Sequence, residues 1–324
     1  MTMRRTGPEG LGWIGEGLDR PECVLCTAAG DTYVSHRTGL TRIDAAGRTS
    51  HRVFGPSPDW MVNGIAIDRD GSFLVANLGR VGGVWRWSSR GGLVPFVTEI
   101  EGTPLPGAAN FVGLDGQGRA WISISTRMQP RDRAFNRGRE DGFVIRVDGT
   151  GARIAAEGFG FTNEAHVDPS GRFLYVNETY ARRLVRFAIS ADGMLGRRET
   201  VTEFGDGAFP DGFAFDTQGH VWVACVVANR LIRVAPSGAQ EIVLDDSDPQ
   251  LDRAADAAWA TERFDRALLN LGEARRLGNL ASVAFGGPDL SLIHLGSLAA
   301  TRIATLRSPV AGVAPHHWDI RPDF

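Results

Sequence analysis

The chain has 324 residues, of which 43% are hydrophobic and 23% charged, with a formal net charge of −3. This composition is typical of a globular protein with a large core, and the lack of a basic excess argues against a nucleic-acid partner. No apolar run is long enough to span a membrane, and the N-terminal residues lack the apolar stretch of a signal peptide. We therefore expect a cytoplasmic protein without a membrane or nucleic-acid partner.

Three cysteines are too few for a disulfide framework, and only Cys23 and Cys26 share a C-x-x-C spacing. The residues between them indicate a strand, on which positions three apart point to opposite faces. We interpret both cysteines as small buried side chains rather than as a redox or zinc pair.

A short phrase recurs six times along the chain. It consists of a lead residue, an apolar run with an Asp five positions after the lead, a Gly eight positions after the lead, and a second apolar run. The Asp-x-x-Gly turn supplies the positive φ that folds two short strands into a hairpin. Four clear copies begin at Asn63, Asn110, Asn163 and Asp211, a looser first copy begins at Glu22, and a last copy begins at Ala281.

Each hairpin is followed by a third apolar run with a central Arg and, in most copies, by a fourth run. Four strands in each of six units predict an all-β, six-bladed β-propeller with four-stranded blades. Closed all-β architectures of this length often form one unit, so we expect residues 1–324 to be a single domain.

Two intervals are longer than the others and predict insertions at about residues 125–142 and 245–279. Strand direction alternates within a blade, so both insertions are expected over the tunnel mouth where the lead residues lie, a usual place for function. In the second insertion, Ala260, Phe264, Leu268 and Leu271 recur at helical spacing, which predicts a helical insertion before the last blade.

The lead residues begin the innermost strand of each blade and therefore border the central tunnel. Five of the six carry side-chain oxygens, and two of these, Glu22 and Asp211, are carboxylates that need a counter-charge when buried. One divalent cation supplies that charge. All-oxygen ligands favour calcium over magnesium or manganese, with zinc and ferrous iron left open. Taken singly, each lead Asn or Asp is better explained as a cap on the turn into its strand, whereas the leads taken together, with a Glu and an Asp among them, favour a metal site.

Five short motifs follow one another in a fixed order. They are Pro21-Glu22-Cys23-Val24, Asn110 ahead of Gly113-Leu114-Asp115-Gly116-Gln117-Gly118, Asn163 ahead of Asp168-Pro169-Ser170-Gly171-Arg172, Pro210-Asp211-Gly212, and Ala284-Phe285-Gly286-Gly287. Their order resembles the senescence-marker-protein (regucalcin)/gluconolactonase family over about residues 20–310. The resemblance implies a propeller that hydrolyses sugar lactones, with metal ligands at Glu22, Asn163 and Asp211 and a metal or substrate contact at Asn110. The related diisopropyl fluorophosphatase uses all four positions.

Two departures from the family pattern alter the substrate side but spare the ligands. The family often has Asn-Asp-Gly where this chain has Asn110-Phe111-Val112, and Pro-Asn-Gly where it has Thr162-Asn163-Glu164. We expect Asn63, Asn110 and Phe111 to contact substrate. Arg127, in the first insertion, is expected to contact a substrate carboxylate.

These observations predict a metal-dependent lactonohydrolase whose partner is a small-molecule lactone. The ion polarises the ester carbonyl, and Asp211 is the candidate general base. A metal-bound hydroxide is the rival base, because positive charge lowers the pKa of a carboxylate. Organophosphate or fluorophosphate hydrolysis at the same ion and a non-catalytic, metal-stabilised binding module are the alternatives. The lactone's identity and the choice between monomer and homodimer stay open.

Overall fold

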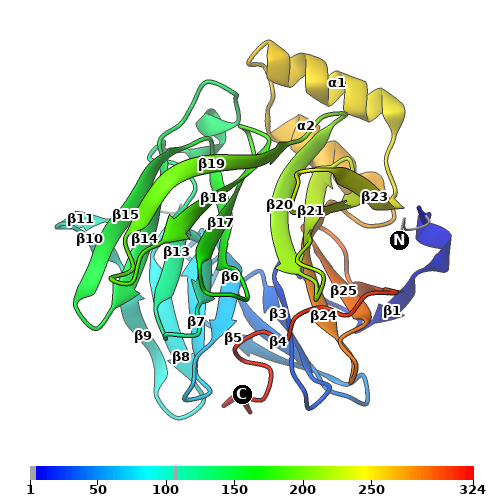
Figure 1. The fold of residues 1–324 in the computed structure, drawn as a ribbon. Helices are drawn as coiled ribbons and strands as arrows, with labels where there is room; N and C mark the ends of the chain where they lie inside the picture. The colour runs from blue at the N-terminus through cyan, green and yellow to red at the C-terminus, as the bar shows by residue number, and fades with distance from the viewer. Residues whose placement is uncertain (1–4, 106–108) are drawn as a thin grey trace.

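The computed structural model describes residues 5–105 and 109–324. Its strands form six four-stranded antiparallel sheets around a central axis, which confirms the predicted six-bladed β-propeller (Figure 1). The first strand of each blade contacts the first strands of both neighbouring blades, so β2, β6, β12, β16, β20 and β24 form a closed inner ring.

Within each blade the strands run from the innermost to the outermost. The first three blades contain β2 (Val24–Cys26), β3 (Thr32–His36), β4 (Gly39–Ile43) and β5 (Thr49–Val53); β6 (Val62–Ile67), β7 (Phe73–Asn77), β8 (Val84–Ser88) and β9 (Gly92–Val97); and β12 (Ala109–Leu114), β13 (Ala120–Ile124), β14 (Gly142–Asp148) and β15 (Gly151–Phe159). The next two contain β16 (Thr162–Val167), β17 (Phe173–Glu178), β18 (Arg183–Ile189) and β19 (Leu195–Glu203); and β20 (Ala208–Phe215), β21 (Val221–Val227), β22 (Arg230–Val234) and β23 (Gln240–Asp245). A short hairpin of β10 (Glu99–Ile100) and β11 (Thr103–Pro104) precedes the third blade.

The sixth blade joins the two ends of the chain. It contains β24 (Leu280–Gly286), β25 (Leu292–Ser297) and β26 (Ile303–Arg307), and its outermost strand is the N-terminal β1 (Gly12–Ile14), which follows the 3-10 helix η1 (Pro8–Gly10). Pairing the N-terminal strand with the last blade closes the ring without an unpaired seam, which removes an exposed sheet edge. The final residues cross the face opposite the helices and bond back to the first blades, as in the 2.9 Å hydrogen bond from Asp323 N to Gly71 O.

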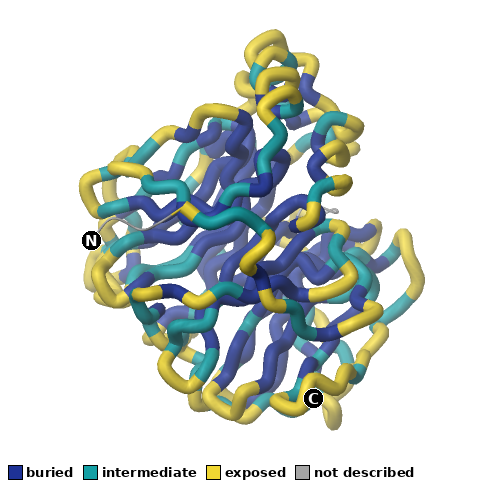
Figure 2. Tube along the Cα trace, turned by 90° about the vertical axis from the view of Figure 1, so that its right-hand side faces the viewer, coloured by how far each residue is buried: buried dark blue, intermediate teal, exposed yellow. Residues whose placement is uncertain are grey.

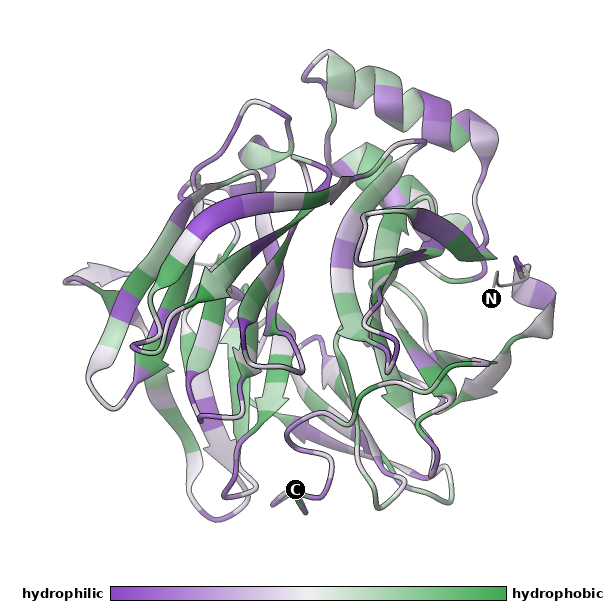
Figure 3. Cartoon of the chain, in the orientation of Figure 1, coloured by the Kyte–Doolittle hydropathy of each residue, from purple (hydrophilic) through white to green (hydrophobic). Residues whose placement is uncertain are grey.

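The core is divided among the gaps between blades. Six apolar clusters each join two neighbouring blades. The inner strands are buried along their length, whereas loops and outer strands are exposed (Figure 2), and the hydrophobic residues follow the same strands (Figure 3). Cys23 and Cys26 lie in two of these clusters as buried free thiols, which confirms their interpretation.

The helical insertion before the last blade is confirmed, but its predicted single run of helical spacing is wrong. The segment folds as α1 (Pro249–Ala260), α2 (Arg266–Leu271) and the 3-10 helix η3 (Gly272–Ala274). α1 ends at Ala260, Glu262 has a φ of +56°, and Asp265 caps α2 by accepting a hydrogen bond from the backbone N–H of Leu268 at 2.9 Å. Phe264 lies in the break and is buried. Neither α1 nor α2, the α-helices of the described residues, is long and apolar enough to cross a membrane.

A seventh apolar cluster joins the two long inter-strand segments to the blades beneath them. The segment between β13 and β14 contains the 3-10 helix η2 (Arg131–Ala134) and contributes Phe135. The segment before β24 contributes Phe264, and both aromatic residues pack in one cluster with Phe161 and the lead residue Ala281. Both segments therefore cover the face of the ring on which Ala281 lies, opposite the C-terminus (Figure 1).

Candidate functional site

The lead residues lie at irregularities of the inner strands. In five blades the register between the first and second strands shifts around the lead residue. Such a β-bulge bends the strand and re-aims one side chain, and bulges are frequent beside active sites. The five polar leads are 2–6% exposed: Glu22, Asn63, Asn110, Asn163 and Asp211. We refer to these five residues as the lead ring.

Asn63 ties one half of the lead ring together. Its Nδ2 donates to Glu22 Oε1 at 2.9 Å and to Asn110 Oδ1 at 2.7 Å, while its Oδ1 accepts from Arg20 Nη2 at 2.6 Å. The amide is thus engaged at both ends. In this arrangement Asn63 holds Glu22 and Asn110 in position, and its expected contact with substrate remains a prediction.

The other half of the lead ring is held by side chains at the end of β17. Asn163 Nδ2 donates to Thr179 Oγ1 at 2.9 Å, and Asn177 Nδ2 donates to the backbone oxygen of Asp211 at 2.9 Å. Because its N–H group is turned to Thr179, Asn163 keeps Oδ1 for another contact.

Two buried oxygens of the lead ring have no hydrogen-bond partner among the described residues. They are Glu22 Oε2 and Asn163 Oδ1. A buried acceptor without a partner costs about 1–3 kcal/mol and therefore calls for an explanation. Carboxylate and amide oxygens are ligands that hard divalent cations prefer, so the donor set fits such an ion.

The charges of the lead ring also favour a bound divalent cation. Burial raises the pKa of Glu22 to about 7, with the nearby charge of Glu164 adding to it. Burial likewise raises the pKa of Asp211, followed by the charges of Glu22 and Glu164. Glu164 is thus a third carboxylate beside the ring, and a divalent cation together with the guanidinium of Arg20 would balance the three negative charges.

A cation at this ring would need amide oxygens as well as carboxylates. Within residues 5–105 and 109–324, no three His, Cys, Asp or Glu side chains form a cluster that could hold a metal ion. Coordination would therefore combine Glu22 and Asp211 with oxygens of Asn163 and Asn110, as calcium tolerates.

The two other sequence-predicted substrate residues lie away from the lead ring. Arg127 Nη2 contacts Glu157 Oε1 at 3.3 Å, and its guanidinium lies 4.2 Å from the ring centroid of Phe143, on the outer part of the third blade. Phe111 is 3% exposed and its ring centroid is 4.7 Å from that of His166. Both remain predictions as substrate contacts, and these positions do not support them.

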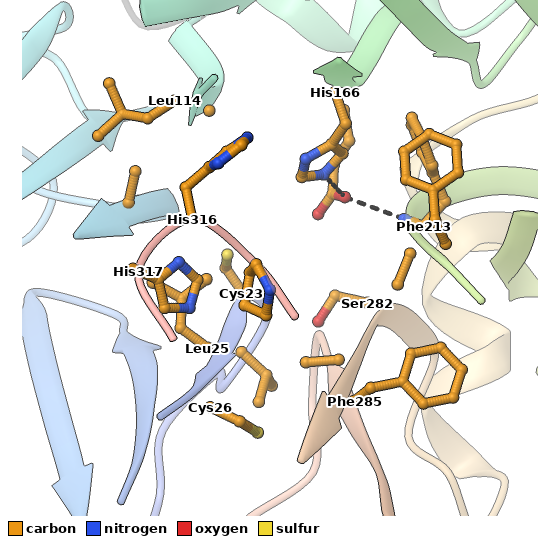
Figure 4. Close-up of a pocket in the computed structure, with 18 of the residues that line it drawn as sticks. Cys23, Leu25, Cys26, Leu114, His166, Phe213, Ser282, Phe285, His316 and His317 are labelled. Atoms are coloured by element: carbon orange, nitrogen blue, oxygen red, sulfur yellow. Dashed lines mark hydrogen bonds and ion pairs between the residues drawn. The ribbon is translucent and has the colours of Figure 1, made fainter. Parts of the chain in front are cut away.

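Phe111 lines a central cavity of about 220 Å³ enclosed by the inner strands beyond the lead ring (Figure 4). Its walls are largely apolar, as at Leu114 and Phe285, and residues 313–317 line its far side. Burial lowers the pKa of His317 to about 4, so this imidazole is neutral at pH 7. The cavity is an apolar space behind the ring, whereas the unpaired oxygens belong to the ring itself.

Three residues near the ring were missed from the sequence. Glu164 accepts hydrogen bonds from Phe213 N and His166 Nε2, each at 2.9 Å. Arg20 precedes the first lead by two positions, and Arg131 donates from Nη2 to Ser125 Oγ at 3.2 Å. The departure from the family pattern at Glu164 was a usable signal, because a carboxylate replaces a glycine there. Nothing in the sequence distinguishes Arg131 from the other arginines of its segment.

Comparisons with known proteins agree with this fold. Residues 21–247 match the family described as SMP-30/Gluconolactonase/LRE-like region. A 6-deoxy-6-sulfogluconolactonase from Pseudomonas putida is 31% identical over 194 residues, which cover 59% of this chain and 54% of the relative. A pentonolactonase from Haloferax volcanii is 28% identical over 238 residues, or 72% of this chain and 66% of the relative. The matches thus span about half to two thirds of the length of these curated relatives.

Solved structures show the same fold at low identity. Regucalcin from Agrobacterium tumefaciens, titled a calcium-binding protein, has a TM-score of 0.67 at 18% identity and covers 99% of this chain and 100% of its own. A gluconolactonase from Xanthomonas campestris has a TM-score of 0.66 at 17% identity, with 91% of this chain and 88% of its own covered. The family match extends over most of the chain and confirms the resemblance seen in the motifs. The chain therefore belongs to the SMP-30/gluconolactonase/LRE-like family.

Proposed function

We propose that this protein is a metal-dependent lactonohydrolase that opens a small cyclic ester, with calcium as the preferred ion. The observation that carries the proposal is the pair of unpartnered buried oxygens, Glu22 Oε2 and Asn163 Oδ1, beside two carboxylates of raised pKa. The two curated relatives are named as lactonases, which supports the reaction class.

Glu22, Asn163, Asp211 and Asn110 would hold the ion, which supplies a positive charge that polarises the ester carbonyl. Asn63 and Ser125 fix Asn110 from two sides, through the 2.7 Å and 3.0 Å hydrogen bonds of their side chains. Ligand oxygens held in this way lose little freedom when substrate binds, which favours preorganised catalysis.

Asp211 is the proposed proton acceptor. Its backbone oxygen is held by Asn177, and its carboxylate lies in the same charged group as Glu22 and Glu164. Asp211 would orient the attacking water and take its proton as the water oxygen bonds to the carbonyl carbon. The proton then passes to the ring oxygen as the ester C–O bond breaks, giving a hydroxy acid.

Chelation provides the direct test of the proposal. Elemental analysis of the purified protein is expected to find one divalent cation per chain, and its removal should abolish lactone cleavage measured by acid release. Readdition of calcium should restore the activity. Unchanged cleavage by metal-free protein would refute the metal, and cleavage of a fluorophosphate but of no lactone would refute the substrate class.

In the metal-free protein, ionisation of Glu22 is expected to remove stability as the pH rises from 6.5 to 8. The raised pKa of Glu22, about 7 against an ordinary 4.5, means that the folded state holds a proton which the unfolded state has already released. The stabilisation that protonated Glu22 provides is fully present below pH 4.5 and is lost as the pH rises through 7. Between pH 6.5 and 8 this loss is about 1 kcal/mol. His294 and His317, whose pKa values burial lowers to about 4, act in the opposite sense up to about pH 7.5, so the contribution of Glu22 is measured as the difference between the wild type and Glu22→Gln.

Calcium should reverse this trend, because it binds the deprotonated carboxylates more tightly as the pH rises. Calorimetric melting temperatures with chelator and with calcium, at pH 6.5, 7.25 and 8, measure both slopes. Glu22→Gln is the matched control, since it lacks this titrating group, and between pH 6.5 and 8 the chelated wild type should lose about 1 kcal/mol of stability relative to it. Equal pH dependence of the two chelated proteins would contradict the assignment.

A further inference from the structure

Several arginines of the two insertions have no carboxylate partner within 4.0 Å in the described part of the chain, and two of these lie against the touching rings of Phe161 and Phe135. These two are Arg131, from η2, and Arg266, the first residue of α2. A nearby arginine shows the contrast, because Arg182 Nη1 lies 2.6 Å from Asp256 Oδ1 of α1. Arg131 is half-buried, and a guanidinium in such a position normally has a partner of this kind, whereas Arg266 is exposed.

Arg131 is directly connected to the lead ring. Its Nη2 donates to Ser125 Oγ at 3.2 Å, and the same oxygen accepts from Asn110 Nδ2 at 3.0 Å. Its Nε is buried without a hydrogen-bond partner among the described residues. The Ser125 hydroxyl therefore links the guanidinium of Arg131 to Asn110, a proposed metal ligand. The Nε–H group of Arg131 makes no hydrogen bond within the described chain and is available to a ligand.

Arg266 approaches the same place from the other insertion. Its guanidinium carbon lies 4.8 Å from the ring centroid of Phe135, and that of Arg131 lies 5.0 Å from the centroid of Phe161. The two aromatic rings are in edge-to-face contact at 5.3 Å, and Phe135 also stacks on Tyr180 at 4.6 Å. The two guanidinium groups thus pack on a pair of aromatic rings that contact each other.

The positive charge of Arg266 acts on Arg131. Burial lowers the pKa of Arg131 to about 9, and the positive charge of Arg266 is the next largest cause. The charge of Arg131 is costly where it is half-buried beside a second, exposed cation, and a bound anion would offset that cost. A guanidinium presents N–H donors in a fork that matches the oxygens of a carboxylate or a related oxyanion.

We propose that the lactone taken by this site carries an anionic group, a sulfonate or a carboxylate remote from the ester, which Arg131 and Arg266 bind together. This inference rests on the proposed lactonase function and narrows it to charged substrates. The lead ring acts on the ester end of the molecule, and the two insertions select the charged end. Arg127, the arginine expected from the sequence, is already paired with Glu157 and is not part of this pair.

The test compares three lactones that differ at one carbon. They are gluconolactone, its 6-deoxy-6-sulfo derivative, and a glucaric acid lactone that carries a carboxylate at the same carbon. For the calcium-loaded enzyme, kcat/KM is expected to be at least about 10-fold higher for one of the anionic lactones than for gluconolactone, mainly through KM. The two anionic arms distinguish sulfonate from carboxylate.

Arg266→Gln and Arg131→Gln are each expected to lower this preference by about 10-fold to 100-fold, the loss of one charge-assisted contact. Arg263→Gln, which removes the same charge from the exposed turn before α2, is the matched control and should leave the preference unchanged. Equal kcat/KM values for the three lactones in the wild type, or equal losses in Arg263→Gln and Arg266→Gln, would overturn the inference.

A binding measurement separates this inference from the proposed function. Calorimetric titration of the chelated protein with each lactone reports affinity without turnover, and the anionic lactone should bind at least about 10-fold more tightly than gluconolactone. If the loaded enzyme opens no lactone but this binding preference holds, the hydrolase proposal fails and the anion site stands. If gluconolactone is hydrolysed but all three lactones bind equally, the anion site fails and the hydrolase proposal stands.

Discussion

Replacing Asp211 by Asn or Glu22 by Gln is expected to lower kcat/KM for lactone hydrolysis by at least about 1,000-fold at micromolar calcium. Each change removes one of the two negative charges that the lead ring would offer to the ion while preserving side-chain volume. Both side chains are at most 6% exposed, so no solvent can replace the lost interaction. Stopped-flow or pH-stat assays over a calcium titration measure the effect.

The titration also separates ion binding from proton transfer. Glu22→Gln should recover much of its kcat at saturating calcium, because Glu22 is proposed only as a ligand. Asp211→Asn should stay inactive at every calcium concentration, since an amide cannot accept the proton of the attacking water. Recovery of both variants at high calcium would leave Asp211 as a ligand alone and move the base elsewhere.

Asp168→Asn is the matched control for the same chemical change away from the lead ring. Asp168 is half-buried in the hairpin turn between β16 and β17, where its carboxylate accepts hydrogen bonds from Ser170 and from the backbone N–H of Phe173 at 2.8 Å. An Asn oxygen accepts the same backbone bond. Its activity and calcium dependence should equal those of the wild type, and a comparable loss would show that the variants act through folding.

The repeat in the sequence predicted the blades because each hairpin is encoded locally. An Asp-x-x-Gly turn between two apolar runs needs no distant partner, and six copies fix the number of blades. The strand that closes the ring is different. β1 has only three residues, and its partner, β26, lies almost 300 residues away in the sequence, so no local pattern identifies the pairing.

The lead ring was predictable for a related reason, since each lead occupies the same place in its repeat. The residues that orient the ring do not recur. Arg20 and Glu164 each stand beside one lead only, and both act on residues of other blades: Arg20 on Asn63, and Glu164 on the backbone of Phe213. Contacts between blades depend on the closed geometry rather than on spacing along the chain.

The insertions are where prediction from the sequence was least complete. The sequence of the first insertion contains several arginines of equal standing, and Arg127 was the expected substrate contact. Arg131 is the first residue of η2, whereas Arg127 precedes that helix, and the two side chains contact different partners, Glu157 for Arg127 and Ser125 for Arg131. Arg131 reaches the ring while its guanidinium packs on Phe161, a contact that the sequence does not reveal.

Replacing Asp216 by Ala is expected to destabilise the protein by about 3–5 kcal/mol, because it breaks a buried ion pair and leaves the partner uncompensated. Asp216 is the turn Asp of the fifth repeat, and its side chain is fully buried. Its Oδ2 accepts from Trp222 Nε1 at 2.9 Å and from Arg233, whose side chain is 4% exposed and whose Nη2 lies 2.7 Å away. The change therefore leaves two buried donors without their acceptor.

The matched control is Asp289→Ala in the hairpin turn of the sixth blade. Asp289 pairs with Arg307 at 3.2 Å, but the two side chains are 58% and 68% exposed, so its loss should cost less than about 1 kcal/mol. Urea unfolding of both variants, followed by tryptophan fluorescence, measures the difference in the free energy of unfolding. Equal costs at the two turns would show that the repeat's Asp acts only by shaping the hairpin. A large cost at Asp216 alone would show that it also links the first three strands of its blade, because Asp216, Trp222 and Arg233 lie at the same end of β20, β21 and β22.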